Sequence, residues 1–453
     1  MPFGTPFVPR FITVHLGSPR VDARNVTVPF SDYVKNVASS EVYPTWPDAA
    51  LRANIYAITT FALNRVYTEF YRAQGYAFDI TSSTSYDQAY IEGRSVFENI
   101  SRLVDAQFGD YVVRRGHVEP MHTSYCNGTT ATCPGLSQWG SFYLANQGFS
   151  PYRILQYYYG SDIDIVFEPP QGNIVESYPG RLQRRGSIGE SVRTIQKMLR
   201  RIRQDYPAIP AVTVNTGVFD APTEAAVRAF QRIFGLTQDG IVGRTTWNRM
   251  VSVYGAVKRL SELNSEGVTP AEAQTLYQSS LRLGDHGFDV KTVQYYLDFI
   301  ALFHPEIPRV IPDGVFGPIT DRAVRAFQQT YGLAADGVVG RNTWNWLQAV
   351  YAETYAALPA GAARNYYPGH AFSEGDTGEK VLLLQTWLNA LAGRIPGLPG
   401  VARDGVFGPA MRSAVTEFQR YAQVPISGDV GPLTWNALWE RYEQDDGAGF
   451  AGD

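Results

Sequence analysis

Two histidines and both cysteines of the chain fall within one short stretch, at His117, His122, Cys126 and Cys133. Imidazole nitrogens and thiolates are ligands that zinc prefers, so zinc is the one cofactor that this pattern suggests. Three ligands would leave a position open for chemistry, and four would make the site structural. Two alternatives remain open: a Cys126–Cys133 disulfide that closes a small loop, or two ordinary thiols.

A second candidate for chemistry is Glu41, which stands among the apolar and aromatic residues Val42, Tyr43 and Trp46. Surroundings that keep water from a carboxyl group favour its neutral form, which can donate a proton. The alternative is a surface glutamate at a turn before a helix, where a negative charge is favourable.

The elements that would hold these residues can be predicted for the first third of the chain. The segments FITVHL and NVTVPF alternate as strands do. Beyond Pro47, Asp48 is placed to cap a long helix with a broad apolar face over Leu51 to Val66. The polar stretch FDITSSTSYDQAY indicates a loop and a short strand, and the region after Gly116 indicates a loop, a helix and a final strand.

This part of the chain resembles the SpoIID/LytB domain of bacterial wall enzymes over roughly residues 10–168. The matching segments, in order, are DYVKNVASSEVYPTWPDAALRANIYAITTFAL, HTSYCNGTT and GLSQWGSFYLANQGFSPYRILQYYYG. The resemblance implies an α+β domain and a lytic transglycosylase activity on glycan strands. It also implies zinc near the HTSYC turn, where His122 and Cys126 match; His117 and Cys133 join them by proximity.

Carried over residue by residue, the resemblance places Glu41 as the catalytic acid and base. One carboxyl group can protonate the glycosidic oxygen and then help the 6-hydroxyl of the sugar close on C1, so a second carboxylate is not needed. Aromatic and polar residues of the matched segments are expected to bind substrate: Trp46, Ser137, Gln138, Trp139 and Tyr157. Core packing is the alternative for the tyrosines after SQWG.

The domain also departs from the family pattern. Only a short stretch separates Gly128 from Ser137, where the family has a long segment, and ATCPG stands where the family has a histidine-containing stretch. The alternative function is therefore a non-catalytic structural protein, anchored to peptidoglycan in wall or spore, whose degenerate domain only recognises glycan. A weaker alternative is that the C-terminal repeats bind a protein partner.

Three repeats follow residue 180. The interval from Phe219 to Gln231 is the same as that from Phe316 to Gln328 and from Phe407 to Gln419. The interval from each glutamine to the next repeated tryptophan is also constant, and these tryptophans are Trp247, Trp344 and Trp435. Each copy predicts three short helices around a small core, and we expect its Phe and Trp to lie in that core. The first copy has VFDAPT where the others have VFGP, which predicts a different turn geometry there.

These repeats resemble the peptidoglycan-binding domain 1 family in their paired glycines, GVFG-like turn, AVRAFQ helix and DGxVGxxTW ending. The resemblance implies non-catalytic attachment to peptidoglycan, and tandem copies allow avidity. The predicted organisation is an α+β domain followed by three three-helix modules. Its boundaries are 1–170 (SpoIID-like domain), 180–252 (repeat 1), 253–280 (helical spacer), 281–350 (repeat 2), 351–372 (linker), 373–442 (repeat 3) and 443–453 (disordered tail).

Composition limits the remaining function classes. The 453 residues carry a net charge of −4 with 44% hydrophobic residues, which indicates a globular protein without a nucleic-acid-binding excess of basic residues. No segment is long and apolar enough for a membrane helix. The N-terminus has no visible Sec signal, so localisation is left open, with wall or spore association expected from the resemblance. The oligomeric state is not predicted.

Overall fold

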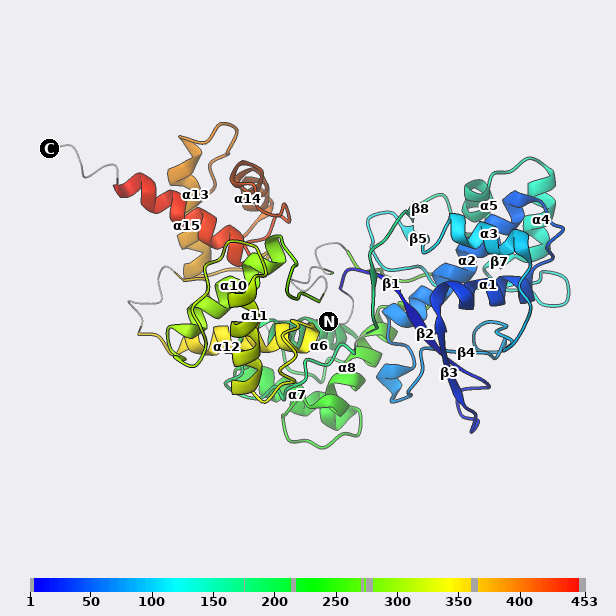
Figure 1. Cartoon of the computed structure of the whole chain (residues 1–453), viewed down its shortest axis with the longest axis horizontal. Helices are drawn as coiled ribbons and strands as arrows, with labels where there is room; N and C mark the ends of the chain where they lie inside the picture. The colour runs from blue at the N-terminus through cyan, green and yellow to red at the C-terminus, as the bar shows by residue number, and fades with distance from the viewer. Residues whose placement is uncertain are drawn as a thin grey trace. The chain divides into compact units, whose positions relative to one another are not determined.

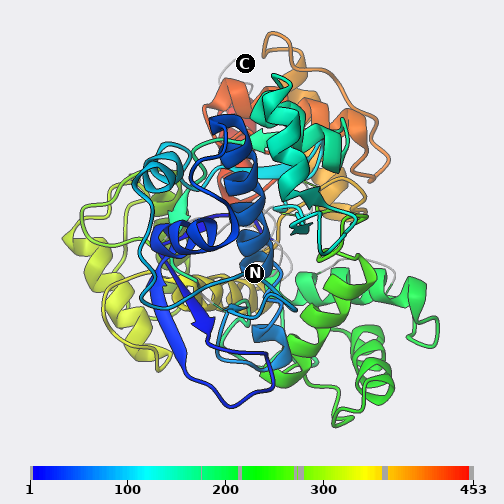
Figure 2. The same ribbon diagram turned by 90° about the vertical axis from the view of Figure 1, so that its right-hand side faces the viewer.

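The computed structural model describes residues 4–174, 176–212, 217–269, 273, 280–359 and 366–447. The chain forms two compact units, drawn in Figures 1 and 2. The first unit contains Met1–Tyr178, Gln204–Tyr206 and Gly243–Thr275. The second contains Pro179–Arg203, Pro207–Val242 and Leu276–Asp453. Residues 243–269, predicted as the end of the first repeat and part of a spacer, thus fold with the N-terminal unit.

The strands of the N-terminal unit are short. The two predicted strands form an antiparallel hairpin, β2 (Phe11–His15) with β3 (Asn25–Pro29), and β4 (Ile80–Thr81) pairs parallel to β2. Three further pairs complete the strands: β1 (Val8–Pro9) with β9 (Gln171–Gly172), β5 (Tyr111–Arg114) with β8 (Ile163–Val166), and β6 (Tyr125–Cys126) with β7 (Leu136–Ser137).

The predicted long helix is α2 (Asp48–Tyr67), and it lies at the centre of this unit, as both ribbon views show. Almost every residue from Ala50 to Val66 is buried, so the helix is covered on all sides rather than on one broad face. Its N-cap is Pro47 without a side-chain bond, because Asp48 lies inside the first turn, where it pairs with Arg52. The helices around it are α1 (Phe30–Glu41), α3 (Glu98–Ala106), α4 (Gln138–Asn146) and α5 (Pro151–Tyr159).

The repeats have the predicted helical elements. Each copy has two isolated bridges, such as Leu281 with Val339 and His286 with Val315 in the second copy. The helices are α6 (Glu190–Asp205), α7 (Ala221–Ile233) and α8 (Arg244–Val257), then α10 (Phe288–Ala301), α11 (Pro318–Thr330) and α12 (Arg341–Ala356), then α13 (Glu379–Ala392), α14 (Pro409–Ala422) and α15 (Pro432–Gly447). The core role of the repeated Phe and Trp is confirmed, since all of them are buried: Phe219, Phe316, Phe407, Trp247, Trp344 and Trp435.

The repeated glutamine has a structural role. Gln328 Oε1 accepts a hydrogen bond from Gly337 N at 2.9 Å, and its Nε2 donates to Val338 O at 3.0 Å. A second buried glutamine, Gln294 on α10, binds the GVF turn in the same way. Both bonds satisfy backbone groups that would otherwise be buried without partners, so these glutamines fix the turns of the module. The glutamine of the first helix was not predicted from the sequence.

The expected change of geometry at VFDAPT is wrong. Asp220 has φ −88° and ψ −178°, and Gly317 in the second copy has φ −84° and ψ −179°. This extended conformation is open to any residue, so losing the glycine has no conformational cost. Asp220 instead caps α7, because its side chain accepts a hydrogen bond from Thr223 N at 2.9 Å.

The predicted connecting segments also differ from the structure. Helix α8 ends at Val257, and residues 258–269 form turns and irregular chain rather than a helical spacer. The start of the predicted linker is helical, because α12 continues to Ala356, and α15 extends into the predicted tail as far as Gly447. Residues 270–272, 274–279, 360–365 and 448–453 lie outside the described residues.

Residues 258–268 pack on the N-terminal unit through their backbone. Asn64 Nδ2 on α2 donates to Leu260 O at 2.8 Å. Val268 N donates to Glu119 Oε2 at 2.7 Å, and Val118 N donates to Val268 O at 2.9 Å. A segment whose polar groups are satisfied in this way is part of the fold rather than a free connection.

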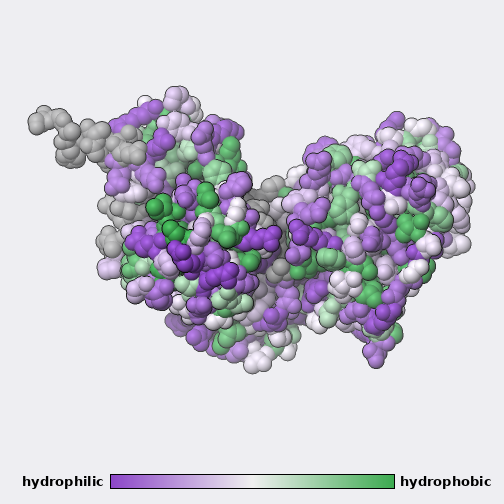
Figure 3. Space-filling model, in the orientation of Figure 1, coloured by the Kyte–Doolittle hydropathy of each residue, from purple (hydrophilic) through white to green (hydrophobic). Residues whose placement is uncertain are grey.

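No helix among the described residues combines the length and apolarity needed to cross a bilayer. In the space-filling view, hydrophobic surface is divided into small patches among hydrophilic side chains (Figure 3).

Candidate functional site

Glu41 is the last residue of α1 and is half-buried. Its Oε1 accepts from Ala89 N at 3.0 Å and faces the Tyr125 hydroxyl at 3.5 Å, and its Oε2 accepts from Gln138 Nε2 at 3.2 Å. All of these donors are uncharged, and no ion pair involves Glu41 within the described part of the chain. The carboxyl group of Glu41 is therefore oriented by neutral hydrogen-bond donors rather than by an ion pair.

Tyr125 was not predicted as a site residue, although it lies within the HTSYC segment. Burial raises the pKa of its hydroxyl well above the usual range, with the negative charge of Glu41 as the next cause. The hydroxyl therefore stays protonated and is available to donate toward Glu41.

An aromatic wall lies beside Glu41, made of Tyr43, Trp46, Trp139, Phe142 and Tyr143. The ring centroids of Trp46 and Trp139 are 5.0 Å apart, and Tyr43 lies 5.7 Å from each of them. Trp46 is buried, whereas Tyr43 is 58% and Tyr143 60% exposed. Two exposed rings on a packed aromatic base provide flat surfaces of the kind that stack on sugar rings. Tyr143 was not predicted as a site residue.

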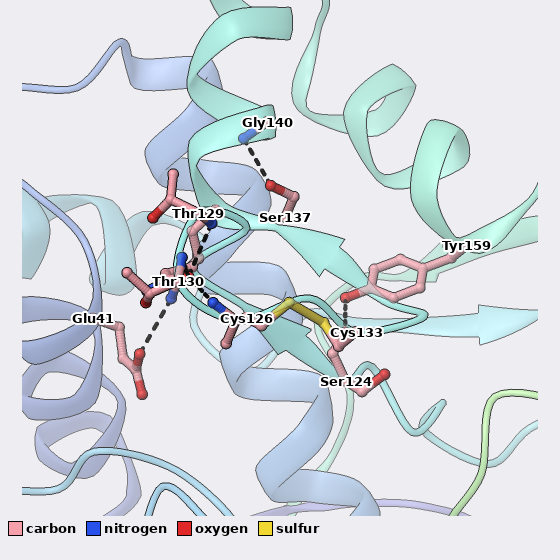
Figure 4. Close-up of a disulfide and its surroundings, with 12 residues drawn as sticks. Glu41, Ser124, Cys126, Thr129, Thr130, Cys133, Ser137, Gly140 and Tyr159 are labelled. Carbon is pink, nitrogen blue, oxygen red and sulfur yellow. Dashed lines mark hydrogen bonds between the residues drawn. A yellow bond between two sulfur atoms is a disulfide. The ribbon is translucent and has the colours of Figure 1, made fainter.

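The loop after β6 positions the start of α4. Asn127 Oδ1 accepts from the backbone N of Thr129, Thr130 and Ala131 at 3.0 Å each, and Trp139 N donates to Asn127 O at 3.1 Å. Figure 4 shows Glu41 pointing toward this loop from the end of α1. The loop thus fixes where α4 begins and, with it, the amide of Gln138 that reaches Glu41.

Gly128 in this loop has a physical reason to be glycine. Its φ is +79°, and an added Cβ would lie 1.9 Å from Ser137 Oγ. Ser137 Oγ caps α4 by accepting from Gly140 N at 2.9 Å. The side chain of Ser137, predicted to bind substrate, is thus engaged within the protein.

The remaining predicted residue, Tyr157, is 65% exposed, and its ring contact is with Tyr158, at 5.0 Å. Its neighbour Tyr159 is buried, and its hydroxyl donates to Ser124 O at 3.0 Å. The structure therefore joins Glu41, Trp46, Gln138 and Trp139 into one group, and no described contact joins Tyr157 to that group.

The four residues predicted as zinc ligands do not form a metal site in the described part of the chain. Cys126 and Cys133 form a disulfide, drawn in Figure 4, so neither sulfur is a thiolate that could bind a metal. His122 packs against the ring of Phe61 at 5.0 Å, and burial lowers its pKa to about 3. His117 Nδ1 instead lies 3.7 Å from Glu119 Oε1. Of the interpretations open from sequence, the structure contains the disulfide.

Comparison with known proteins agrees with this architecture. The family model described as "Stage II sporulation protein" matches residues 22–111. The family model described as "Putative peptidoglycan binding domain" matches residues 188–250, 286–347 and 377–438. The chain is therefore a SpoIID domain followed by three peptidoglycan-binding domains. The SpoIID match includes Glu41 and ends before the disulfide loop and Gln138.

Curated relatives are similar over part of the chain. The N-acetylmuramoyl-L-alanine amidase CwlM of Mycobacterium tuberculosis is 39% identical over 28% of this chain and 26% of its own length. The N-acetylmuramoyl-L-alanine amidase CwlL of Bacillus licheniformis is 30% identical over 36% of this chain and 44% of its own length. A zinc D-Ala-D-Ala carboxypeptidase of Streptomyces albus G is 35% identical over 20% of this chain and 34% of its own length. The chain thus spans less than half of each relative.

Proposed function

We propose that this protein binds peptidoglycan through its C-terminal modules and cleaves glycan strands as a lytic transglycosylase. The observation that carries the second part is the setting of Glu41, which is held by neutral donors beside an exposed aromatic wall. The peptidoglycan-binding domains and the names of the relatives support the first part, since all of them concern the bacterial wall.

Glu41 performs both proton transfers in this proposal. It gives its proton to the glycosidic oxygen as the bond to C1 breaks, and it then takes the proton of the 6-hydroxyl as that oxygen closes on C1. The products are a 1,6-anhydro end and a new free 4-hydroxyl end, so no water is consumed. Gln138 and Tyr125 are positioning residues, because they touch Glu41 and hold its two oxygens in place. Tyr43 and Tyr143 offer stacking surfaces for the sugar rings.

The test is digestion of purified glycan strands stripped of stem peptides, followed by mass spectrometry. We expect anhydro-ended products from the unsubstituted chain and a loss of at least about 100-fold in Glu41→Gln, since general acid–base catalysis contributes that much. Glu98→Gln is the matched control, because Glu98 is an exposed glutamate on α3. Equal rates for Glu41→Gln and the unsubstituted chain would refute the assignment of Glu41.

A second candidate function is a non-catalytic anchor in wall or spore. It is favoured by the end of the SpoIID match at residue 111, which leaves the shortened segment from Gly128 to Ser137 outside the family pattern. An anchor would sediment with purified sacculi and give no anhydro products. A transglycosylase would give both results.

A further inference from the structure

All three modules share one backbone feature, a pair of glycines joined by a hydrogen bond. Gly287 N donates to Gly314 O at 2.8 Å in the second module, and Gly378 N donates to Gly405 O at 2.9 Å in the third. Gly287 has φ 122° and ψ −167°, and Gly378 has φ 121° and ψ −171°. This region of backbone space is essentially restricted to glycine and recurs at functional sites. The first module has the same bond, from Gly189 to Gly217.

Each glycine pair is followed by a valine that the fold does not bury. Val218, Val315 and Val406 are 38%, 54% and 44% exposed, although the next residue in each module is a buried phenylalanine. We call the glycine pair and this valine the glycine face of each module. Single exposed apolar residues are ordinary, but exposure at one register in three copies indicates a contact surface. In the third module Leu382, also exposed, extends the face beside Gly405.

The glycine pair of the first module is covered by the chain itself, whereas Val218 beside it stays 38% exposed. At Gly189, an added Cβ would lie 3.7 Å from Ala349 Cα. His370 packs on Gly217, where an added Cβ would lie 3.4 Å from His370 Cβ. The next residue, Ala371, is bound through its main chain. Its N donates to Glu190 Oε1 at 2.8 Å, and its O accepts a hydrogen bond from the Arg193 guanidinium. Arg193 also pairs with Asp376.

The other two glycine faces are open. Among the described residues, nothing lies within 4 Å of a Cβ added at Gly287 or Gly378. At Gly314 and Gly405, the atoms near an added Cβ belong to the module's own chain. The same backbone surface is therefore filled in one module and accessible in two.

The filled face indicates what the open faces accept. Its occupant is a short segment recognised through the N–H and C=O of an alanine, by one carboxylate and one guanidinium. Each open module keeps one partner of that kind at the matching position, Lys291 in place of Arg193 and Glu379 in place of Glu190, and both are exposed. The acetamido groups of the glycan also carry an N–H and a C=O, but the stem peptide adds alanine residues and charged groups that Lys291 and Glu379 can pair with.

We propose that the glycine faces of the second and third modules bind peptidoglycan stem peptides, and that residues 370–373 close the face of the first module. This inference rests on the proposed peptidoglycan binding and names the component that is bound. Two linked weak sites hold a polymer more tightly than one site does. The chain therefore attaches by two modules, and the first module serves to organise the unit.

The test compares sedimentation of the full chain with intact sacculi and with sacculi whose stem peptides an amidase has removed. The chain carries Glu41→Gln so that the strands are not cut during the measurement. We expect binding to the stripped sacculi to be at least about tenfold weaker, since one lost module contact of this size changes affinity by about that factor. Equal affinity for both preparations would overturn the inference while leaving peptidoglycan binding intact. Failure to bind either preparation would overturn both proposals.

The modules themselves provide the matched control. Val315→Asp with Val406→Asp should weaken binding to intact sacculi by at least about tenfold, whereas Val218→Asp in the filled module should change it less than about twofold. Equal losses from Val218→Asp and from the double variant would contradict the inference. If aspartate at these valines unfolds a module, as circular dichroism would reveal, Lys291→Ala with Glu379→Ala replaces the double variant, since both side chains are exposed and the same loss is expected.

Discussion

Glu69 is expected to make the stability of the N-terminal unit depend on pH. It follows α2, and its carboxylate accepts from Ser177 N at 2.7 Å and from Ser177 Oγ at 2.8 Å. The same hydroxyl accepts from Trp247 Nε1 at 2.9 Å, so Glu69 is linked to helix α8 through Ser177. Burial raises the pKa of Glu69 from 4.5 to about 7, although the two bonds from Ser177 lower it.

The direction follows from proton binding. Between pH 4.5 and about 7 the folded chain keeps a proton on Glu69 that the unfolded chain has released, so stability falls as pH rises. The contribution is fully present below pH 4.5 and lost above about pH 7. A difference of about 2.5 pKa units corresponds to about 3 kcal/mol of unfolding free energy.

The measurement is urea unfolding of the full chain and of Glu69→Gln at intervals from about pH 4 to about pH 9. Glutamine does not ionise, so the stability difference between the two chains should change by about 3 kcal/mol across the interval and level off above about pH 8. A constant offset is also expected, because the amide accepts only one of the two bonds from Ser177. A difference that does not vary with pH would refute the reasoning about Glu69.

Three other predictions concern named bonds. Replacing Cys126 and Cys133 by Ser should lower the free energy of unfolding in urea by about 2.5 kcal/mol, because the disulfide closes a short loop. A reducing agent should lower the stability of the unsubstituted chain by the same amount. An unchanged stability in the reducing agent would contradict the disulfide. Gln328→Leu should lower the free energy of unfolding by about 2–4 kcal/mol, because it leaves Gly337 N and Val338 O without partners. The control Gln329→Leu changes an exposed neighbour and should lower the free energy of unfolding by less than about 0.5 kcal/mol. Gln138→Leu should lower kcat about tenfold with KM unchanged, since its amide is hydrogen-bonded to Glu41 and positions that carboxyl group. A change in KM alone would assign Gln138 to substrate binding.

Predictions from sequence were most reliable where local spacing carries the information. The repeats were visible because the same residue types recur at the same intervals in every copy, and the structure buries those Phe, Gln and Trp residues. The two predicted strands and the predicted long helix are β2, β3 and α2, for which alternation and apolar content are sufficient.

Predictions were least reliable in the segments between repeats. The spacing of Val257, Leu260 and Leu263 is typical of a helix, yet α8 ends at Val257, because the following backbone bonds to the N-terminal unit instead. At Asp220 the prediction was also wrong: the absence of a glycine predicted a different turn geometry, but the backbone conformation at this position is one that any residue can adopt.

The sequence by itself determined the order of the domains, the helical elements of the repeats and the choice of Glu41 as the candidate acid. Only the tertiary structure decided which groups surround that acid: Ala89, Tyr125 and Gln138 are 48, 84 and 97 residues away along the chain. It also decided that Cys126 bonds to Cys133 rather than joining His122, and that one glycine face is filled while two are open. The physical reason is that periodicity records which side of an element is buried, whereas these contacts depend on which distant segments fold against each other.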